Sequence, residues 1–355
     1  MSKENTRRSF LEVKDLEVVY TQNKKTVHAV NGVTFRMKKG ETLGLVGETG
    51  AGKTTIAKTI LRILPDIAAE VRGGEIYLDD VDILSASEDE MLNIRGKKVS
   101  MIFQDPMTAL NPLMTVGDQI LEVIQLHNDC DKNEGIKLAG DMLEMVGIPR
   151  MRYKEYPHQF SGGMKQRVVI AMALACNPEL LLADEPTTAL DVTVQAQVLD
   201  LIRELKEKYE TSLILVTHDL GVVAQTCDKV AVIYAGEVVE YGSKEDLFDH
   251  PMHPYTLGLF RSLPEMALGE KRLHSIAGLP PDPTNLPEGC KFWPRCPYMS
   301  EECKGEMKTR RINPHHTCRC IKEKAPDGSF VIAADREAEE EKELHETLHH
   351  GGGRR

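Results

Sequence analysis

The chain has 355 residues, a hydrophobic fraction of 41% and a formal net charge of −11 at pH 7. This length allows one large domain and a smaller one, and the negative charge argues against nucleic acid as a partner, because phosphate binding needs a basic surface. No run approaches the roughly 18 apolar residues of a membrane-spanning helix, and the first residues lack the apolar segment of a secretion signal. We therefore expect a folded protein of the cytosol.

The first part of the chain predicts a β-rich region followed by an α/β core. In LEVKDLEVVY the apolar residues fall at near-alternate positions, which predicts a half-buried strand, and HAVNGVTFRM is expected to continue it. The short apolar runs in ETLGLVG, LLLADEP and SLILVTHD are separated by helical patterns. Short apolar strands that alternate with helices predict a parallel, doubly wound sheet.

Residues about 105–177 predict a helical insert in this core. VGDQILEVIQL and GIKLAGDMLEMVG have helical spacing, and Gly147 and Pro149 end the second helix. Further on, KVAVIYAGEVVEYG predicts a hairpin around Ala235 and Gly236. The next short helix is expected to begin with a capping box, which Ser243 and Asp246 would form.

Composition divides the rest of the chain. Beyond about Leu263 proline, glycine and cysteine become frequent, which predicts a domain boundary, and the run Asp335–Glu346 is mostly acidic, as in a solvated helix or disordered tail. The expected organisation is a large domain at 1–262, an extension with clustered cysteines at 263–330 and an acidic tail at 331–355. Three cysteines outside the cluster, Cys130, Cys176 and Cys227, are predicted to be structural, with Cys176 buried.

A glycine-rich loop predicts a nucleotide site. The segment GETGAGKT matches G-x-x-x-x-G-K-[ST] between an apolar run and a helix. In such a loop backbone N–H groups surround the phosphates, the lysine adds a positive charge and the last hydroxyl binds Mg²⁺. A glycine turn that matches by chance is the lesser alternative in this context. The predicted nucleotide-binding residues here are Gly47, Glu48, Thr49, Gly50, Ala51, Gly52, Lys53, Thr54 and Thr55.

Two acids end a second apolar strand. Asp184 is placed to join the Mg²⁺ shell, and Glu185 to orient or deprotonate a water that attacks the γ-phosphate. Because Pro186 and Thr187 follow, both acids could instead belong to a helix N-terminus. The glycine-rich loop favours the catalytic interpretation.

Together these motifs resemble those of the ATP-binding-cassette (ABC) ATPases. FSGGMKQR is similar to the family's signature motif, Gln104 in MIFQDP to its Q-loop, ALD ending at Asp191 to its D-loop, and His218 in VTHD to its switch histidine. The resemblance implies an α/β fold, the ABC-type nucleotide-binding domain, with a RecA-like parallel sheet core, an N-terminal antiparallel β subdomain and a helical insert. It also implies an ATPase that uses Mg²⁺.

The resemblance assigns further roles. Tyr20 would stack on adenine, Gln104 would join Thr54 at the Mg²⁺ ion, and His218 would contact the γ-phosphate and hold the attacking water beside Glu185. In this family the signature motif of one protomer closes on the ATP of another, so a single chain should be a poor ATPase. The residues implied at this interface are Ser161, Gly162, Gly163, Met164 and Asp191.

Two signature positions depart from the family's frequent pattern. Met164 stands where glutamine is frequent, and Phe160 where leucine is frequent. Neither change removes the groups that a phosphate needs, because Ser161 still supplies a hydroxyl and the two glycines expose N–H groups at a helix N-terminus.

The segment after the core resembles the C-terminal region of dipeptide and oligopeptide importer ATPases. The resemblance is carried by HPMHPYTLGLFRSLP, GLPPDPTNLPEGCKFWPRCPYMSEEC and HHTCRC. It implies ATP hydrolysis that powers peptide import at the cytoplasmic face of the membrane, where the chain would be peripheral. The implied partners are two permease subunits, a second ABC ATPase chain, expected as a heterodimer, and an extracytoplasmic peptide-binding protein. A nickel-importer ATPase, or a soluble ABC ATPase that acts on nucleic acid or ribosomes, is the alternative.

Five of the eight cysteines gather near the C-terminus. Cytosolic thiols are kept reduced, so a disulfide framework is not expected. The gaps between Cys290, Cys296 and Cys303 are too wide for a zinc knuckle, yet four thiolates suit either zinc or an iron–sulfur cluster, and spacing alone does not decide between them. Buried thiols that act as small hydrophobes fit a proline-rich segment poorly.

The family resemblance favours the cluster. The importer ATPases carry a [4Fe–4S] cluster here, with the last ligand a few residues after a histidine. Matching that histidine to His316 makes Cys320 the fourth ligand, beside Cys290, Cys296 and Cys303, with Cys318 as the alternative. The cluster would staple an extension that is too small to hold itself by burial, and a redox-sensing role stays open.

Overall fold

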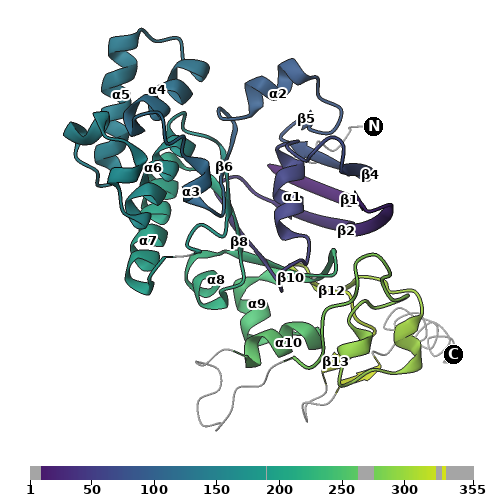
Figure 1. Cartoon of the computed structure of the whole chain (residues 1–355). Coiled ribbons are helices and arrows are strands. Elements are labelled where there is room, and N and C mark those ends of the chain that lie inside the picture. Colours follow the sequence, from purple (N-terminus) through teal and green to yellow (C-terminus); the bar gives the residue numbers. More distant parts are fainter. Residues whose placement is uncertain (1–8, 189, 263–275, 325–329, 333–355) are drawn as a thin grey trace, which may run out of the picture.

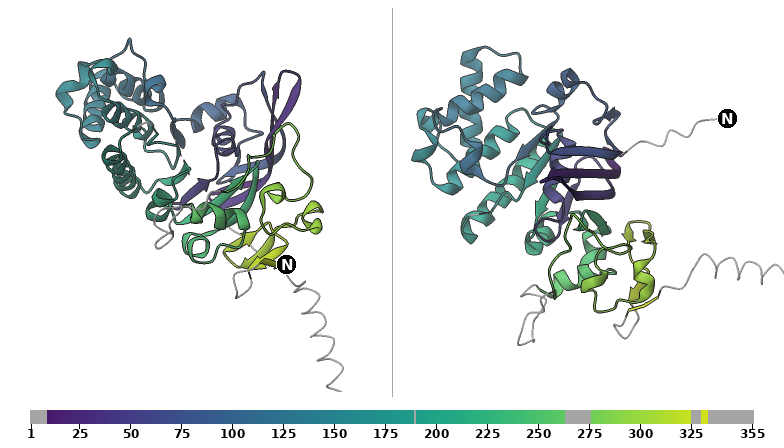
Figure 2. Two further views of the ribbon diagram at one scale, coloured as in Figure 1. Left: turned by 60° about the horizontal axis from the view of Figure 1, so that its bottom comes forward. Right: turned by 45° about the vertical axis from the view of Figure 1, so that its right-hand side comes forward.

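The computed structural model of the chain describes residues 9–188, 190–262, 276–324 and 330–332. A four-stranded sheet and a helical lobe (residues 106–174) lie on different sides of a central eight-stranded sheet. The C-terminal segment (276–324 and 330–332) packs below the core in the view of Figure 1. The two further views in Figure 2 keep the helical lobe and the four-stranded sheet apart. The predicted acidic tail lies outside the described residues, apart from 331 and 332. The predicted division at residue 263 stays a prediction.

The N-terminal sheet confirms the predicted β-rich start. Its strands are β1 (Leu11–Gln22), β2 (Lys25–Met37), β4 (Ala69–Leu78) and β5 (Val81–Asp82), all antiparallel, in the order β2-β1-β4-β5. The second strand does not continue the first but pairs with it, because the two residues between them, Asn23 and Lys24, have φ values of 51° and 63° and form a tight hairpin.

The central sheet holds the three predicted short apolar strands side by side. Its parallel part has the order β9-β3-β8-β7-β6, and three of these strands are buried along their whole length because helices cover the sheet. The sheet is mixed rather than wholly parallel, because the predicted hairpin at Ala235 and Gly236 reverses the chain into an antiparallel strand. Two strands of the C-terminal segment extend that edge. The members are β3 (Thr42–Val46), β6 (Val99–Ile102), β7 (Leu180–Asp184), β8 (Ser212–Thr217), β9 (Lys229–Tyr234), β10 (Glu237–Ser243), β11 (Arg310–Asn313) and β12 (His316–Cys318).

The predicted helical insert is confirmed. Asp131 caps one of its helices, and Gly147, with φ of 77°, lies just past the end of that helix, as the sequence predicts. Within the described part of the chain, every helix is too short or too polar to cross a lipid bilayer. The insert comprises α3 (Pro106–Ala109), α4 (Val116–His127), α5 (Lys132–Met145), the 3₁₀ turns η1 (Arg150–Lys154) and η2 (Pro157–Gln159), and α6 (Gly162–Leu174).

The remaining helices connect the sheets or follow them. Ser243 caps α9 by accepting a hydrogen bond from the Asp246 amide. The Asp246 carboxylate accepts from the Ser243 hydroxyl rather than from the Ser243 amide, so the capping box is only half formed. Cys176 is only partly buried, which corrects the sequence prediction, whereas Cys227 is 2% exposed. The elements not yet named are α1 (Lys53–Ile60), α2 (Glu88–Ile94), α7 (Val192–Tyr209), α8 (Leu220–Thr226), α9 (Lys244–Asp249), α10 (Pro254–Arg261), η3 (Trp293–Arg295), η4 (Glu301–Lys304), β13 (Lys322–Lys324) and β14 (Phe330–Ile332).

Candidate active site

The glycine-rich loop joins the end of β3 to the start of α1. Gly47 has φ of 152°, and a Cβ atom there would lie 2.1 Å from the Ile233 carbonyl oxygen. Gly52 has φ of 101°, and its Cβ would lie 2.3 Å from the Ala29 carbonyl oxygen. The backbones of β9 and β2 therefore lie too close to the loop for a side chain at either position, and only glycine fits there. Gly50 has φ of 79° but open space around it.

Lys53 places its ammonium group inside the loop. Its Nζ donates hydrogen bonds to the carbonyl oxygens of Gly47 at 2.8 Å and Glu48 at 2.9 Å. Burial lowers the pKa of Lys53, and the nearby acids Glu185, Asp184 and Glu48 oppose that change. The loop thus presents a positive charge where a phosphate group would be bound.

Thr54 and Asp184 meet beside this charge. The Thr54 hydroxyl donates to Asp184 Oδ1 at 2.9 Å, so the start of α1 and the end of β7 are joined. Burial raises the pKa of Asp184, and the Thr54 hydrogen bond acts against that rise. A hydroxyl and a carboxylate at this spacing offer the oxygen ligands that Mg²⁺ prefers. At the other side of the loop, the Tyr20 hydroxyl lies 3.4 Å from Thr55 Oγ1.

Glu185 is held by three side chains, one three residues further along and two from distant parts of the chain. Gln104 Nε2 donates to Oε2 at 2.7 Å, the Thr188 hydroxyl donates to the same oxygen at 3.0 Å, and His218 Nδ1 lies 3.2 Å from Oε1. Burial raises the pKa of this carboxyl, but the hydrogen bonds with His218 and Thr188 and the charges of His218 and Lys53 together lower it, and the net shift is downward. A carboxylate that stays ionised can accept a proton from water. Thr188 was not anticipated from the sequence.

The signature residues and Asp191 lie away from the loop. Ser161 caps α6, accepting from the Met164 amide at 3.4 Å, and Asp191 caps α7, accepting from the Val194 amide at 3.0 Å. Helix α6 stands in the helical lobe, apart from α1 (Figure 1). The chain therefore brings together the loop, Asp184, Glu185, Gln104 and His218, but not the signature motif.

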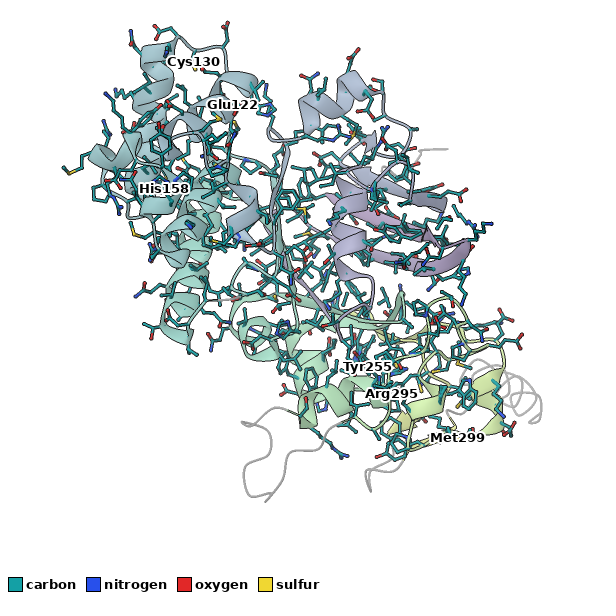
Figure 3. The ribbon with its side chains drawn as sticks, in the orientation of Figure 1. Glu122, Cys130, His158, Tyr255, Arg295 and Met299 are labelled. Atoms are coloured by element: carbon teal, nitrogen blue, oxygen red, sulfur yellow. The ribbon has the colours of Figure 1, made fainter. Side chains whose placement is uncertain are left out.

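Two residues far along the chain hold Glu48 of the loop. Arg295 donates from Nη1 and Nη2 to the two carboxylate oxygens, at 2.7 Å and 3.0 Å. The Glu48 amide donates to the Tyr255 hydroxyl at 2.9 Å. Figure 3 shows Tyr255 and Arg295 as neighbours at the base of the core. Sequence reasoning missed both, because they lie more than 200 residues from Glu48 (separations of 207 and 247) and no local pattern links them.

The clustered cysteines share one enclosed cavity. Cys290, Cys296, Cys303 and Cys320 line it together with His253 and Phe292, and its volume is about 10 Å³. Cys318 is fully buried but does not line it. Burial raises the pKa of Cys290 to about 12 and that of Cys296 to about 11. In the described ranges no group of three or more His, Cys, Asp or Glu side chains could hold a metal ion, so the predicted metal-cluster extension is not supported as a formed ion site.

His253 adds an unpaired donor to this cavity. The ring is fully buried, and its Nδ1 accepts a hydrogen bond from the Tyr255 amide at 3.0 Å. Burial lowers the pKa of His253 to about 3, so the ring is neutral and its proton lies on Nε2. His253 Nε2 has no hydrogen-bond partner. A buried N–H without a partner is unfavourable, and an acceptor in the cavity would satisfy it.

Known proteins match both parts of the chain. Residues 30–188 match the family model for the ABC transporter, and residues 239–303 match the model for the oligopeptide/dipeptide transporter, C-terminal region. Among curated proteins, the oligopeptide transport ATP-binding protein OppD of Bacillus subtilis is 52% identical over 86% of this chain and 87% of its own length. The oligopeptide transport ATP-binding protein AppD of the same organism is 49% identical over 83% of this chain and 90% of its own length.

The fold also matches solved structures. A dimeric, post-hydrolysis structure of the ATP-binding cassette MJ0796, bound to ADP and Pi, superposes with a TM-score of 0.60 at 28% identity and covers 66% of this chain and 98% of that one. The helical lobe, the central sheet and the glycine-rich loop are thus those of an ABC nucleotide-binding domain. The chain belongs to the ABC transporter family, in the group of the ATP-binding proteins of oligopeptide and dipeptide transporters.

Proposed function

We propose that this chain is the ATP-hydrolysing subunit that powers import of dipeptides or oligopeptides through a membrane permease. The observation that carries this proposal is the identity of about half of the aligned residues to peptide transport ATP-binding proteins, over most of both chains. The match to the peptide-transporter C-terminal region supports peptides rather than another cargo, because that region is separate from the ATPase motifs that ABC proteins share.

ATP would bind with its phosphates in the loop Gly47–Thr55. The carbonyl groups that now accept from Lys53 hold its ammonium close to the site of the phosphates, and Thr54 with Asp184 supplies oxygen ligands to Mg²⁺. Gln104 would add its amide oxygen to that ion, since its Nε2 is used by Glu185. Tyr20, which lies on β1, would stack on the adenine ring of ATP.

Hydrolysis would depend on Glu185. Its lowered pKa keeps the carboxylate ionised, and an ionised carboxylate orients the attacking water and takes up its proton. His218, 63% exposed in its side chain, is free to turn toward the γ-phosphate while its Nδ1 stays beside Glu185. The charge that develops on the γ-phosphate would be stabilised by Lys53 and Mg²⁺.

The site would be completed by a second ATPase chain. Ser161, Gly162, Gly163 and Met164 form the N-terminus of α6, and a helix N-terminus favours anions such as the phosphates of ATP. Asp191 would lie at the same interface. We expect a heterodimer on two permease subunits, at the cytoplasmic face of the membrane, with peptides supplied by an extracytoplasmic binding protein.

The C-terminal cysteines would hold a [4Fe–4S] cluster. Four thiols line one cavity together with the ring of His253, and four thiolates suit either zinc or an iron–sulfur cluster. The match of this region to the peptide-transporter C-terminal region favours the cluster. Cys290, Cys296, Cys303 and Cys320 are the proposed ligands, which their shared cavity supports, and Cys318 is the alternative to Cys320. The cluster would supply structural cross-links.

The transport proposal is tested with the chain assembled with its permease pair and second ATPase in lipid vesicles. ATP hydrolysis that rises when dipeptides and their binding protein are added supports it, and a Lys53→Ala complex serves as the inactive control. Stimulation by Ni²⁺ instead of peptides, or of the isolated chain by DNA or ribosomes, would contradict it.

The cluster proposal is tested by metal analysis and absorption spectra of protein purified without oxygen. We expect about four irons per chain, lost in Cys290→Ser and in Cys320→Ser but retained in Cys318→Ser. One zinc per chain, or no metal, would overturn the cluster.

A further inference from the structure

The glycine-rich loop that would bind the phosphates, called the phosphate loop below, is held at Glu48 by residues from outside the loop. The Glu48 side chain receives two hydrogen bonds from the forked guanidinium of Arg295, and the Glu48 amide gives one to Tyr255. Both the backbone and the side chain of Glu48 are therefore held. Because Glu48 directly follows Gly47 in the loop that surrounds Lys53, its position sets the shape of that loop.

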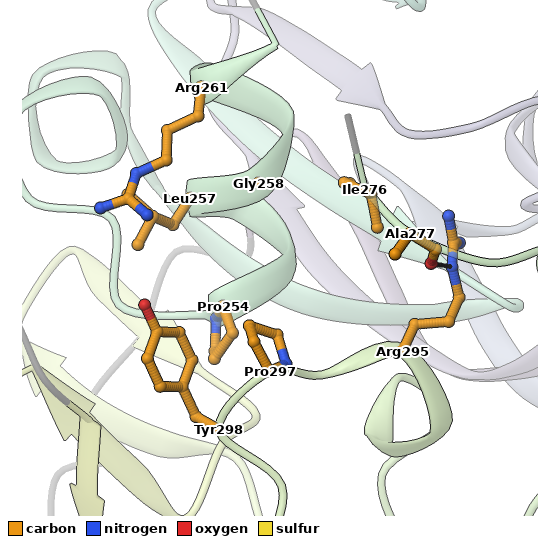
Figure 4. A pocket seen from close by; sticks show the side chains of 9 residues that line it. All are labelled: Pro254, Leu257, Gly258, Arg261, Ile276, Ala277, Arg295, Pro297 and Tyr298. Atoms are coloured by element: carbon orange, nitrogen blue, oxygen red, sulfur yellow. Dashed lines mark hydrogen bonds between the residues drawn. The ribbon is translucent and has the colours of Figure 1, made fainter. Parts of the chain in front are cut away.

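Arg295 is itself immobilised. Its side chain is only 6% exposed, its Nε donates to the Ala277 carbonyl oxygen at 3.0 Å, and its Nη1 also reaches the Tyr234 hydroxyl at 3.3 Å. Figure 4 shows the bond to Ala277 at one side of a cavity of about 210 Å³ between α10 and the segment with Arg295. Since open space separates this segment from much of α10, the hydrogen bonds of Arg295 fix its place there rather than dense packing.

Both contacts lead to the cavity that the cysteines line. Arg295 directly precedes Cys296, and Tyr255 is joined through its amide to the ring of His253, which also lines that cavity. Phe292, a third lining residue, packs against the rings of Tyr234 and Tyr255 with centroid distances of 5.2 Å and 5.3 Å. A change in the position of the cysteines would therefore move the groups that hold Glu48.

We propose that Arg295 and Tyr255 are positioning residues that couple the cysteine cavity to the phosphate loop, so that the arrangement of the cysteines sets the affinity for ATP. This inference rests on the nucleotide site of the proposed function. A shift at the cavity would pass through the packed rings of Phe292 and Tyr255, which have little room to relax independently, and through the hydrogen bonds of Arg295. The extension thus acts on the ATP site although none of its described residues belongs to the phosphate loop.

The first test measures the dissociation constant of a fluorescent ATP analogue for the full chain. Arg295→Gln removes the charged fork, and Glu48→Gln weakens the same pair from the loop side. We expect each variant to bind about tenfold more weakly, because a small misplacement of a binding loop has effects of this order or larger. The double variant should be no weaker than either single variant, since both remove one interaction. Arg295→Lys, which keeps the charge but not the fork, should fall between wild type and Arg295→Gln.

A matched control and a positive control separate the possible outcomes. Arg203→Gln breaks an exposed ion pair with Asp200 on α7 and should bind as wild type does. Lys53→Ala should lose binding. If Lys53→Ala loses binding while Arg295→Gln and Glu48→Gln bind normally, the coupling is wrong and the nucleotide site stands. If wild type does not bind the analogue, the proposed function fails instead.

The second test starts from the cavity. Cys296→Ser should weaken binding of the same analogue about as much as Arg295→Gln, and combining the two should add little. Tyr255→Phe, which keeps the ring but not the acceptor, should give a smaller loss in the same direction. Cys130→Ser, in the helical lobe, is the matched control. Wild-type affinity in Cys296→Ser, with the thermal unfolding midpoint lowered, would show that the cysteines stabilise the extension without reaching the phosphate loop, and would overturn the inference.

Discussion

At the scale of single residues, the proposed mechanism depends on Glu185 and on the hydrogen bonds around it. Glu185→Gln keeps the size of the side chain but removes the charge that accepts a proton. We expect ATP to bind as in wild type and turnover to fall by about a hundredfold or more. Binding is measured with a fluorescent analogue and turnover by phosphate release in the assembled transporter. Glu179→Gln is the control, because it breaks an ion pair with Lys39 at the opposite end of β7 from Glu185. Full turnover in Glu185→Gln would contradict the proposed role of Glu185 in activating water.

The second prediction at this scale concerns how Thr188 affects the pH dependence of ATP hydrolysis. Burial raises the pKa of Glu185, whereas the hydrogen bonds with His218 and Thr188, together with the charges of His218 and Lys53, lower it by more. The proposed mechanism uses the ionised carboxylate, so we expect activity to fall as the pH drops through this pKa. In Thr188→Val one donor is lost, the pKa rises and the acidic limb of the kcat profile moves to higher pH. The measurement is kcat against pH, with Thr34→Val, on the four-stranded sheet, as control. A shift to lower pH, or none, would contradict this.

At the scale of elements, one buried carboxyl group ties the C-terminal segment to the core. Glu240 of β10 accepts from the amides of Met252 and His253 at 2.7 Å and 2.9 Å, and from His316 of β12 at 2.7 Å. The side chains of Glu240 and His316 are 0% and 2% exposed. This carboxyl therefore fixes the start of α10 and the neighbouring strand together.

Glu240→Ala should destabilise the protein strongly. It leaves three donors buried without an acceptor, and removing one partner of a buried pair costs about 3–5 kcal/mol. The measurement is the free energy of unfolding in urea. Glu75→Ala, which breaks a half-exposed ion pair with Lys14, should change it by about 1 kcal/mol or less. A loss in Glu240→Ala as small as that of the control would show that β12 is not held through this group.

How far the sequence predicts the molecule depends on whether the signal is local. The strands β3, β7 and β8 and the phosphate loop follow from short patterns of apolar residues and glycines, and all are found as predicted. The hydrogen bond from Arg295 to Glu48 joins residues 247 apart, and that from His316 to Glu240 joins residues 76 apart. No periodic pattern in the sequence predicts either contact. Such contacts depend on how distant segments pack in the finished fold, and local sequence patterns do not give that.

At the scale of the whole molecule, a substitution at Gly162 tests whether the signature motif contacts a partner chain rather than its own chain. A Cβ atom at Gly162 would lie 3.8 Å from Leu190 Cδ2, an ordinary contact, whereas one at Gly163 would lie 2.4 Å from Val194 Cγ1. Gly162→Ala is therefore expected to fold and bind ATP normally, because its own chain has room for the methyl group. If the signature motif closes on the ATP of a second chain, that methyl group obstructs the γ-phosphate of the partner.

The assembled transporter tests this difference between the two glycines. Gly162→Ala should lower ATP turnover of the complex by about tenfold or more, with unfolding free energy and nucleotide affinity of the isolated chain unchanged. Gly163→Ala should lower the unfolding free energy of the isolated chain, since Val194 must move. Normal turnover in a complex that carries Gly162→Ala would mean that no phosphate comes near this helix N-terminus, and the site would then be complete within one chain.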